Sequence, residues 1–293
     1  MILTKFQVRF SPTLANKPKS TKFRTPGEKT FDPFENPSEG LLVTEDDDNF
    51  IVLNKFPVIP DHFILATKQY KLQTHLLEEC DVGAAYQCLA AYRDNGEELF
   101  GFFNSGDESG ASQPHRHIQF LPVDSMRSGI TEPQTWSVLA DILAAENPGM
   151  YPALLGGVVL IDHKLVMPFK YFASSIDEGF TSLQLYESYL DLHSKACQSA
   201  GQQPVKPHAD VESPISYNLG LTSRTMILCP RTCEGIKIKS DKNELIGPVS
   251  LNGTVLGGTL LVKSKEEWDA LKNDNSKLEH VLRSIGITHD GKL

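Results

Sequence analysis

The chain has 293 residues, of which 40% are hydrophobic and 22% are charged, and its formal net charge is −9 at pH 7. These values exclude an intrinsically disordered chain and allow one large domain or two modest ones. An acidic surface is not a nucleic-acid footprint, so a polyanion could bind only in a locally basic pocket. No run approaches ~18 uninterrupted apolar residues, so we expect neither a membrane span nor a membrane partner.

The five cysteines are scattered along the chain, which favours reduced thiols and a cytoplasmic location. Cys229 and Cys233 lie close in sequence, but no second close pair completes a four-ligand zinc site. The acidic residues 46–48 are typical of a solvated turn. The sequence therefore predicts no metal site.

The N-terminal third predicts an extended arm followed by an antiparallel meander. Residues 16–37 are rich in Lys, Pro, Thr and Phe and are typical of an arm with turns. Pro57 and Pro60 prevent the second strand of the meander from continuing into the third. Strands are predicted over residues 40–44, 50–54 and 62–67.

The remaining chain predicts helices and strands without a regular β-α-β alternation, which indicates an α+β fold. Helices are predicted over residues 78–99, 135–145, 180–200 and from residue 265. Strands are predicted over residues 99–104, 115–121, 215–221, 225–229 and 259–262, with loops over 105–114 and 250–258. We predict an N-terminal catalytic region over residues 1–165 and a C-terminal region over residues 175–293 that completes the site.

The segment that carries candidate chemistry is a strand end, a loop and a second strand over residues 103–120. Gly106 and Gly110 allow the backbone to approach a ligand closely, and successive backbone N–H groups in such a loop can bind an anion. Further donors lie along the same stretch at Ser105, Ser109, Ser112 and Gln113. A loop of this composition is, by itself, more often a simple connector.

Three polar side chains share one face of the second strand. Alternate strand residues lie on the same side, which places His115, His117 and Gln119 together. A stripe of two imidazoles and an amide has no reason to face an apolar core. It predicts the wall of a cavity.

Three chemical roles fit this stripe, and a fourth interpretation gives the histidines no chemical role. The imidazoles could ligate zinc with a third ligand from elsewhere, or they could act as general acid and base. One imidazole could attack phosphorus, because a neutral ring with a pKa near ~6.5 is a competent nucleophile at neutral pH. The pair could also be solvated strand histidines without a chemical role.

The segment GASQPHRHIQ, residues 110–119, resembles the active-site segment of the histidine-triad superfamily in its transferase form, where Gln occupies the third triad position. Within that superfamily the chain resembles the diadenosine tetraphosphate phosphorylases, or ATP adenylyltransferases. Supporting matches are DPFENP at 32–37, VLNKFP at 52–57, YNL at 217–219, MILCPR at 226–231, NGT at 252–254 and GGTLLVK at 257–263. The resemblance implies a histidine-triad-like antiparallel sheet with packed helices, elaborated by the C-terminal segment.

The resemblance also implies roles for individual residues. His117 would become adenylylated, Gln119 would bind the phosphate that it carries, and His115 would complete the catalytic triad. Lys17, in the basic arm, would reach the distal phosphates. The other implied substrate contacts are Asn54 and Lys55 at the nucleoside, Asn104, Ser105, Gly110, Ala111, Ser112 and Gln113 at the phosphates, and Asn252, Gly253, Thr254, Thr259 and Lys263 from the C-terminal half.

Two departures from the family pattern bear on substrate preference. Thr259 stands where methionine is expected, and Gly253 and Thr254 also differ from the pattern. Arg231, in the MILCPR match, is equally compatible with a phosphate clamp and with a surface charge.

The implied reaction is a double displacement. His117 attacks the α-phosphorus of diadenosine tetraphosphate and ATP leaves, after which inorganic phosphate attacks adenylyl-His117 and releases ADP. The expected partners are small nucleotides and phosphate; no cofactor is required, although a divalent cation such as magnesium could assist. The alternatives are a hydrolase with water as acceptor, a hexose-1-phosphate uridylyltransferase, whose zinc-type cysteine cluster is not visible here, and a nucleotide-binding module without catalysis.

Overall fold

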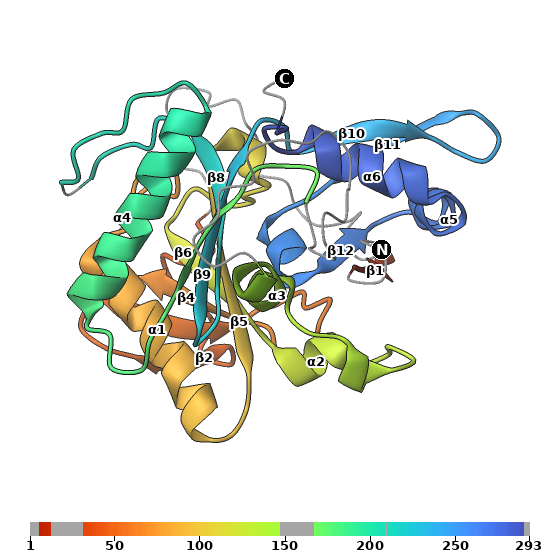
Figure 1. Ribbon diagram of the computed structural model, residues 1–293. Helices are drawn as coiled ribbons and strands as arrows, with labels where there is room; N and C mark the ends of the chain where they lie inside the picture. The colour runs from red at the N-terminus through yellow and green to blue at the C-terminus, as the bar shows by residue number, and fades with distance from the viewer. Residues whose placement is uncertain (1–5, 13–31, 147–166, 209, 290–293) are drawn as a thin grey trace, which may run out of the picture.

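A computed structural model describes residues 6–12, 32–146, 167–208 and 210–289. Its centre is an eight-stranded sheet in the order β2-β3-β4-β6-β5-β8-β9-β7, in which every neighbouring pair is antiparallel (Figure 1). The strands are β2 Leu42–Glu45, β3 Asn49–Leu53, β4 Phe63–Thr67, β5 Leu99–Ser105, β6 His117–Pro122, β7 Phe172–Ser175, β8 Ser216–Leu221 and β9 Thr225–Arg231. The predicted α+β fold and the predicted meander of β2, β3 and β4 are confirmed.

One face of the sheet is covered by two helices, α1 (Glu79–Asp94) and α4 (Ser182–Ser199), which lie side by side (Figure 1). Each helix begins at a capping box, formed by Glu78 and Asp81 in α1 and by Thr181 and Gln184 in α4. These reciprocal bonds satisfy backbone N–H groups that the first turn leaves without partners. Apolar side chains from alternate strand positions pack beneath both helices.

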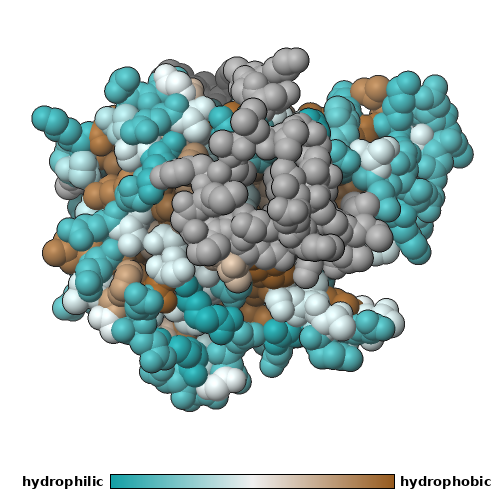
Figure 2. All heavy atoms as spheres, viewed as in Figure 1, coloured by the Kyte–Doolittle hydropathy of each residue, from teal (hydrophilic) through white to brown (hydrophobic). Residues whose placement is uncertain are grey.

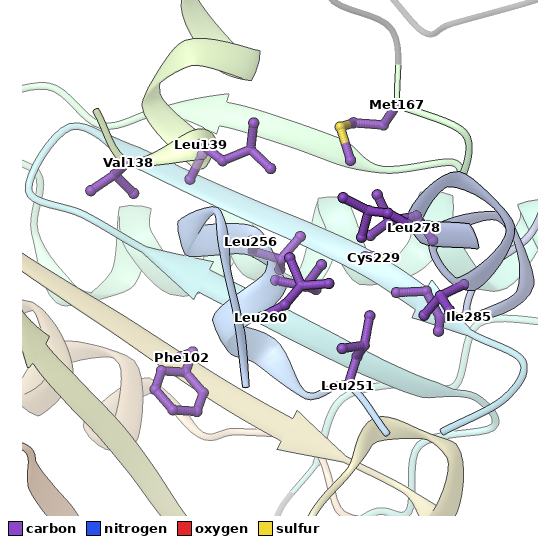
Figure 3. Packing of buried hydrophobic residues seen from close by; sticks show 14 of the residues in the cluster. Phe102, Val138, Leu139, Met167, Cys229, Leu251, Leu256, Leu260, Leu278 and Ile285 are labelled. Atoms are coloured by element: carbon purple, nitrogen blue, oxygen red, sulfur yellow. The ribbon is translucent and has the colours of Figure 1, made fainter. Parts of the chain in front are cut away.

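The C-terminal half covers the opposite face over β5, β8 and β9. There Phe102 of β5 and Cys229 of β9 share one hydrophobic cluster with Leu256, Leu260 and Leu278 from the C-terminal elements (Figure 3). The elements of this layer and its surroundings are η5 Gly253–Gly257, β12 Thr259–Val262, α5 Lys265–Asn273, α6 Asn275–Ser284 and α3 Leu139–Glu146. Strands from both halves thus build one sheet, and side chains from both halves fill the core behind it.

The remaining elements lie around the central sheet and the layers that cover its two faces. Strand β1 pairs in parallel with β12, and β10 forms an antiparallel hairpin with β11 whose visible surface is mostly hydrophilic (Figure 2). Their bounds, with those of the short helices, are β1 Gln7–Phe10, β10 Gly235–Lys239, β11 Leu245–Ser250, α2 Val123–Arg127, η3 Asp107–Ser109 and η4 Pro133–Thr135. Among the described helices, none is both long and apolar enough to cross a membrane.

Several predicted elements differ from the observed ones. The helix predicted over 135–145 begins only at Leu139, after the 3-10 helix η4 that ends at Thr135, and the loop predicted over 250–258 contains η5. Strands β1, β7, β10 and β11 and helix α2 were not predicted, since these segments of four to six residues are too short to show a clear period. Most of the predicted arm lies outside the described residues. The division into regions 1–165 and 175–293 stays a prediction. Strands β8 and β9 of the later region, and β7 at its boundary, continue the common sheet.

Candidate active site

A cavity of about 390 Å³ lies on the sheet face beside the C-terminal layer, between β3, β4, β6 and the loop that precedes β2. Its apolar wall includes Phe34, Val52 and Ile64. The polar side chains on its wall include six that the sequence predicted: Asn54, Lys55, Ser112, Gln113, His117 and Gln119. None of the described lining residues is acidic, so the cavity is suited to a ligand that has both an apolar ring system and anionic groups.

His117 is the first residue of β6 and its side chain is only 3% exposed. Its Nδ1 lies 2.8 Å from the backbone oxygen of His115. A carbonyl oxygen can only accept, so Nδ1 carries a proton and the lone pair of the neutral ring is on Nε2. The local backbone therefore selects the tautomer that a nucleophilic Nε2 requires.

His115 lies behind His117 and does not line the cavity. Its Nδ1 is 2.7 Å from the Asp32 carboxylate, and its Nε2 is 2.7 Å from the backbone oxygen of Thr67. The ring of Phe34 packs against both histidines, with centroid distances of 5.6 Å to His115 and 5.1 Å to His117. These contacts hold the carbonyl that orients His117, whereas direct participation of His115 in catalysis stays a prediction.

The Gln73 side chain hydrogen-bonds both the N–H and the carbonyl of His117. Its Oε1 accepts from the His117 N–H at 2.8 Å, and its Nε2 donates to the carbonyls of His117 at 3.1 Å and of Asn104 at 2.8 Å. Regular pairing of β5 with β6 ends at Phe102 and Gln119. The buried Gln73 amide thus bridges the two strands where they separate, at His117.

Replacing Gln73 with Glu is expected to lower the rate of adenylylation by roughly 10- to 100-fold. The change puts a carboxylate oxygen opposite two carbonyls, and displacement of a reacting group by about 1 Å costs on the order of 10²-fold. Single-turnover kinetics measures this rate. Gln69→Glu makes the same change at an exposed position in the same connection and should behave like the wild type. An unaltered rate in Gln73→Glu would contradict the positioning role.

The loop over residues 105–114 and the C-terminal half meet beside Asn104. Gly110 has φ +77°, and a Cβ there would lie 2.7 Å from the Leu251 oxygen and 2.9 Å from the Asn252 Cβ, so only glycine fits this approach. Asn252 caps η5 by accepting from the backbone and hydroxyl of Thr254. The Gly253 N–H donates to Asn104 Oδ1 at 2.7 Å. Asn104, Gly110, Asn252, Gly253 and Thr254 are thus brought together next to the cavity, and their contacts with substrate stay predictions.

Other predicted site residues lie apart from the cavity. Ser105 pairs with Tyr217 on the face covered by α4, because successive strand residues alternate between faces. Thr259 in β12 accepts from Gln7 Nε2 at 2.8 Å, and Lys263 follows that strand; neither lines the cavity. Lys17, like the arm around it, lies outside the described residues.

Arg231 is neither a phosphate clamp nor a surface charge. It is 4% exposed, and its guanidinium donates to the backbone oxygens of Cys233, Leu251 and Ile285. Cys229 is buried in the core, and all five cysteines are free thiols. Within the described ranges no group of three or more His, Cys, Asp or Glu side chains could hold a metal ion.

Comparisons with known proteins identify the family to which the chain belongs. A family model described as "Ap4A phosphorylase N-terminal domain" matches residues 3–138, and one described as "ATP adenylyltransferase C-terminal domain" matches residues 166–288. The chain belongs to the Ap4A phosphorylase (ATP adenylyltransferase) family. It is therefore an enzyme of the nucleotidyltransferase class.

Similar proteins of this family are found in Saccharomyces cerevisiae. Diadenosine 5',5'''-P1,P4-tetraphosphate phosphorylase 2 is 28% identical over 97% of this chain and 84% of its own length, and Protein APA1 is 27% identical over 96% and 83%. The crystal structure of yeast Ap4A phosphorylase Apa2 in complex with Ap4A has a TM-score of 0.69 at 26% identity, covering 96% of this chain and 84% of that chain. The chain thus shares the fold of this Ap4A phosphorylase over nearly its whole length.

Sequence reasoning missed the residues that hold the site of this family member together. Asp32 and Phe34 lie in a matched segment but were not assigned to the site, and Asn218 lies in another. Their positions in matched segments were the only available signal. Thr67 and Gln73 carry no sequence signal, since they act through single contacts with distant backbone groups.

Proposed function

We propose that the protein cleaves diadenosine tetraphosphate with inorganic phosphate to ADP and ATP. The observation that carries this proposal is His117 on the cavity wall, with Nδ1 on the His115 carbonyl, which puts the lone pair of the neutral ring on Nε2. The apolar lining residues suit a nucleobase and the polar ones suit the phosphates. The yeast relative that is similar over almost the whole chain is named for phosphorolysis of this substrate.

The reaction consists of two displacements at one phosphorus. In the first, His117 Nε2 forms a bond to the α-phosphorus while the bond to the bridging oxygen breaks, so ATP leaves with the electron pair. In the second, an oxygen of inorganic phosphate bonds to the same phosphorus, the N–P bond breaks and ADP leaves. Both steps depend mainly on positioning and charge neutralisation. A divalent cation such as magnesium could assist that neutralisation.

Gln119 favours phosphate over water as the acceptor. Its amide can donate a hydrogen bond to a phosphoryl oxygen, but it cannot take a proton from water as a histidine at the same position could. Inorganic phosphate is anionic at neutral pH and needs no such base. Lys55, Ser112 and Gln113, which line the same cavity, supply a cation and further hydrogen-bond groups for the phosphate chain.

Mass spectrometry of protein incubated with diadenosine tetraphosphate, without phosphate, tests the proposal. We expect ATP in solution and one added AMP on the peptide that contains His117, and we expect phosphate to discharge that adduct as ADP. Release of AMP plus ATP regardless of phosphate would instead identify a hydrolase. Nucleotide binding without any adduct or product would identify a binding module and overturn both enzymatic readings.

A cytoplasmic location belongs to the same proposal, since five free thiols are typical of a reducing compartment. The proposed partners are nucleotides and phosphate, with neither nucleic acid nor a membrane. Fractionation of cells that express the protein would test the location.

A further inference from the structure

A chain of buried polar side chains connects the C-terminal half to the strand beside the nucleophile. It runs from Arg231 on β9 through Asn218 on β8 to Asn104 on β5, and these side chains are at most 4% exposed. Each buried polar group needs a hydrogen-bond partner of the right kind, so the orientation of one amide restricts the next. The cation at one end can only donate, which gives the chain a direction.

Arg231 determines the orientation of Asn218. Its Nη1 bonds Asn218 Oδ1, while Nε and Nη2 donate to the backbone oxygens of Ile285 at 3.0 Å and Leu251 at 2.9 Å. Burial lowers the pKa of Arg231 to about 10, so the side chain remains a cation at neutral pH. A guanidinium has no acceptor, and the amide oxygen of Asn218 must therefore face it.

Asn218 in turn determines the orientation of Asn104. With its oxygen on Arg231, its Nδ2 donates to Asn104 Oδ1 at 2.8 Å and to the Ser109 carbonyl at 2.9 Å. The Gly253 N–H donates to the same Asn104 oxygen at 2.7 Å. Two donors thus hold Asn104 Oδ1 toward the C-terminal half, which leaves Nδ2 as the group that Asn104 can offer to a ligand.

Asn104 and His117 lie next to each other on the same face of the sheet. Phe102 pairs with Gln119, and two residues further along each strand are Asn104 and His117. The single Nε2 of Gln73 bonds the backbone oxygens of both residues, at 2.8 Å and 3.1 Å. The Asn104 side chain is therefore on the same sheet face as that of His117, across the gap that Gln73 bridges.

We propose that Arg231 and Asn218 are positioning residues that keep the Asn104 amide turned with its N–H group toward the transferring phosphoryl group. This inference rests on the proposed function. A donor aimed at developing phosphoryl charge stabilises the transition state, and the loss of one such donor costs on the order of 10²- to 10³-fold in rate. An inverted Asn104 would present an oxygen to that charge instead.

Two substitutions of Asn218 separate this role from a structural one. Asn218→Asp keeps the shape and should pair with Arg231, but it sets a carboxylate oxygen against Asn104 Oδ1. We expect this charged repulsion to outweigh the single Gly253 N–H bond and to invert the Asn104 amide. Asn218→Ala leaves Asn104 oriented by the Gly253 N–H. We expect the rate of adenylylation at saturating diadenosine tetraphosphate to fall about 100-fold in Asn218→Asp and only about 10-fold in Asn218→Ala.

Thermal stability should follow the opposite order, with Asn218→Asp melting at or above the temperature of Asn218→Ala. A purely structural role predicts the same order for rate and stability, because aspartate fills the space of asparagine and alanine leaves it empty. A wild-type rate in Asn218→Asp, a faster Asn218→Asp than Asn218→Ala, or failure of Asn218→Asp to fold would each overturn the proposal. Absence of an adduct in the wild type would instead overturn the proposed function.

Discussion

Replacing His117 with alanine is expected to lower turnover of diadenosine tetraphosphate by at least about 10³-fold, because the change removes the atom that bonds to phosphorus. No other imidazole lines the described cavity. No AMP adduct should form on the protein, with or without phosphate. Steady-state ADP and ATP production, together with mass spectrometry of the intact chain, measures both effects.

Folding should survive the loss of this side chain. The His117 side chain hydrogen-bonds the His115 carbonyl, and loss of that bond should cost about 1–2 kcal/mol of unfolding free energy. His280→Ala makes the same change at an exposed position on α6 and should keep wild-type activity. Retention of a tenth of the wild-type rate in a well-folded His117→Ala protein would rule out His117 as the nucleophile.

Replacing Arg116 with methionine is expected to lower the free energy of unfolding by about 3–5 kcal/mol, because it leaves a buried carboxylate without its partner. Arg116 lies between the two histidines but points to the opposite face. There its Nη1 contacts Asp81 Oδ2 at 2.7 Å and Glu78 Oε1 at 2.9 Å. Arg116 and Asp81 are 1% and 3% exposed. Urea unfolding of the variant and the wild type measures the difference.

Arg116→Lys is the matched control, and its free energy of unfolding should fall much less than that of Arg116→Met. Within the part of the chain that the structure describes, Nε and Nη2 of Arg116 have no hydrogen-bond partner, and Nη1 alone makes both ion pairs. A lysine ammonium can replace that single nitrogen. Equal destabilisation by Lys and Met would contradict an electrostatic role and indicate that packing of the longer side chain is what matters.

The loss of unfolding free energy in Arg116→Met, relative to the wild type, should be smaller at acidic pH. Burial alone would raise the pKa of Glu78, but hydrogen bonds from Lys71 and Arg116 outweigh it and hold the pKa below its ordinary value. A carboxyl with a lowered folded-state pKa adds stability above its unfolded pKa of about 4.3, and that stability is lost as pH falls through the folded value. The two proteins should therefore differ less below about pH 4 than at pH 7.

Much of the site could be predicted because it is local. The glycine-serine loop and the stripe of His115, His117 and Gln119 are contiguous, and the alternation of a strand is enough to put the stripe on one face. The structure keeps His117 and Gln119 on the cavity wall but turns both nitrogens of His115 toward Asp32 and Thr67. The composition of the stripe could not distinguish a cavity-facing histidine from a supporting one.

The sequence by itself determined the antiparallel meander, and it predicted the nucleophile and the phosphate-binding loop, because each depends on neighbours along the chain. Only the tertiary structure decided what orients them: Gln73 meets His117 across 44 positions, and Asn218 meets Asn104 across 114. These hydrogen bonds join single side chains to groups that are distant in sequence. They follow no period, so no pattern along the chain predicts them. They exist because burying a polar group without a partner is costly, and the partner is whichever group the fold brings near.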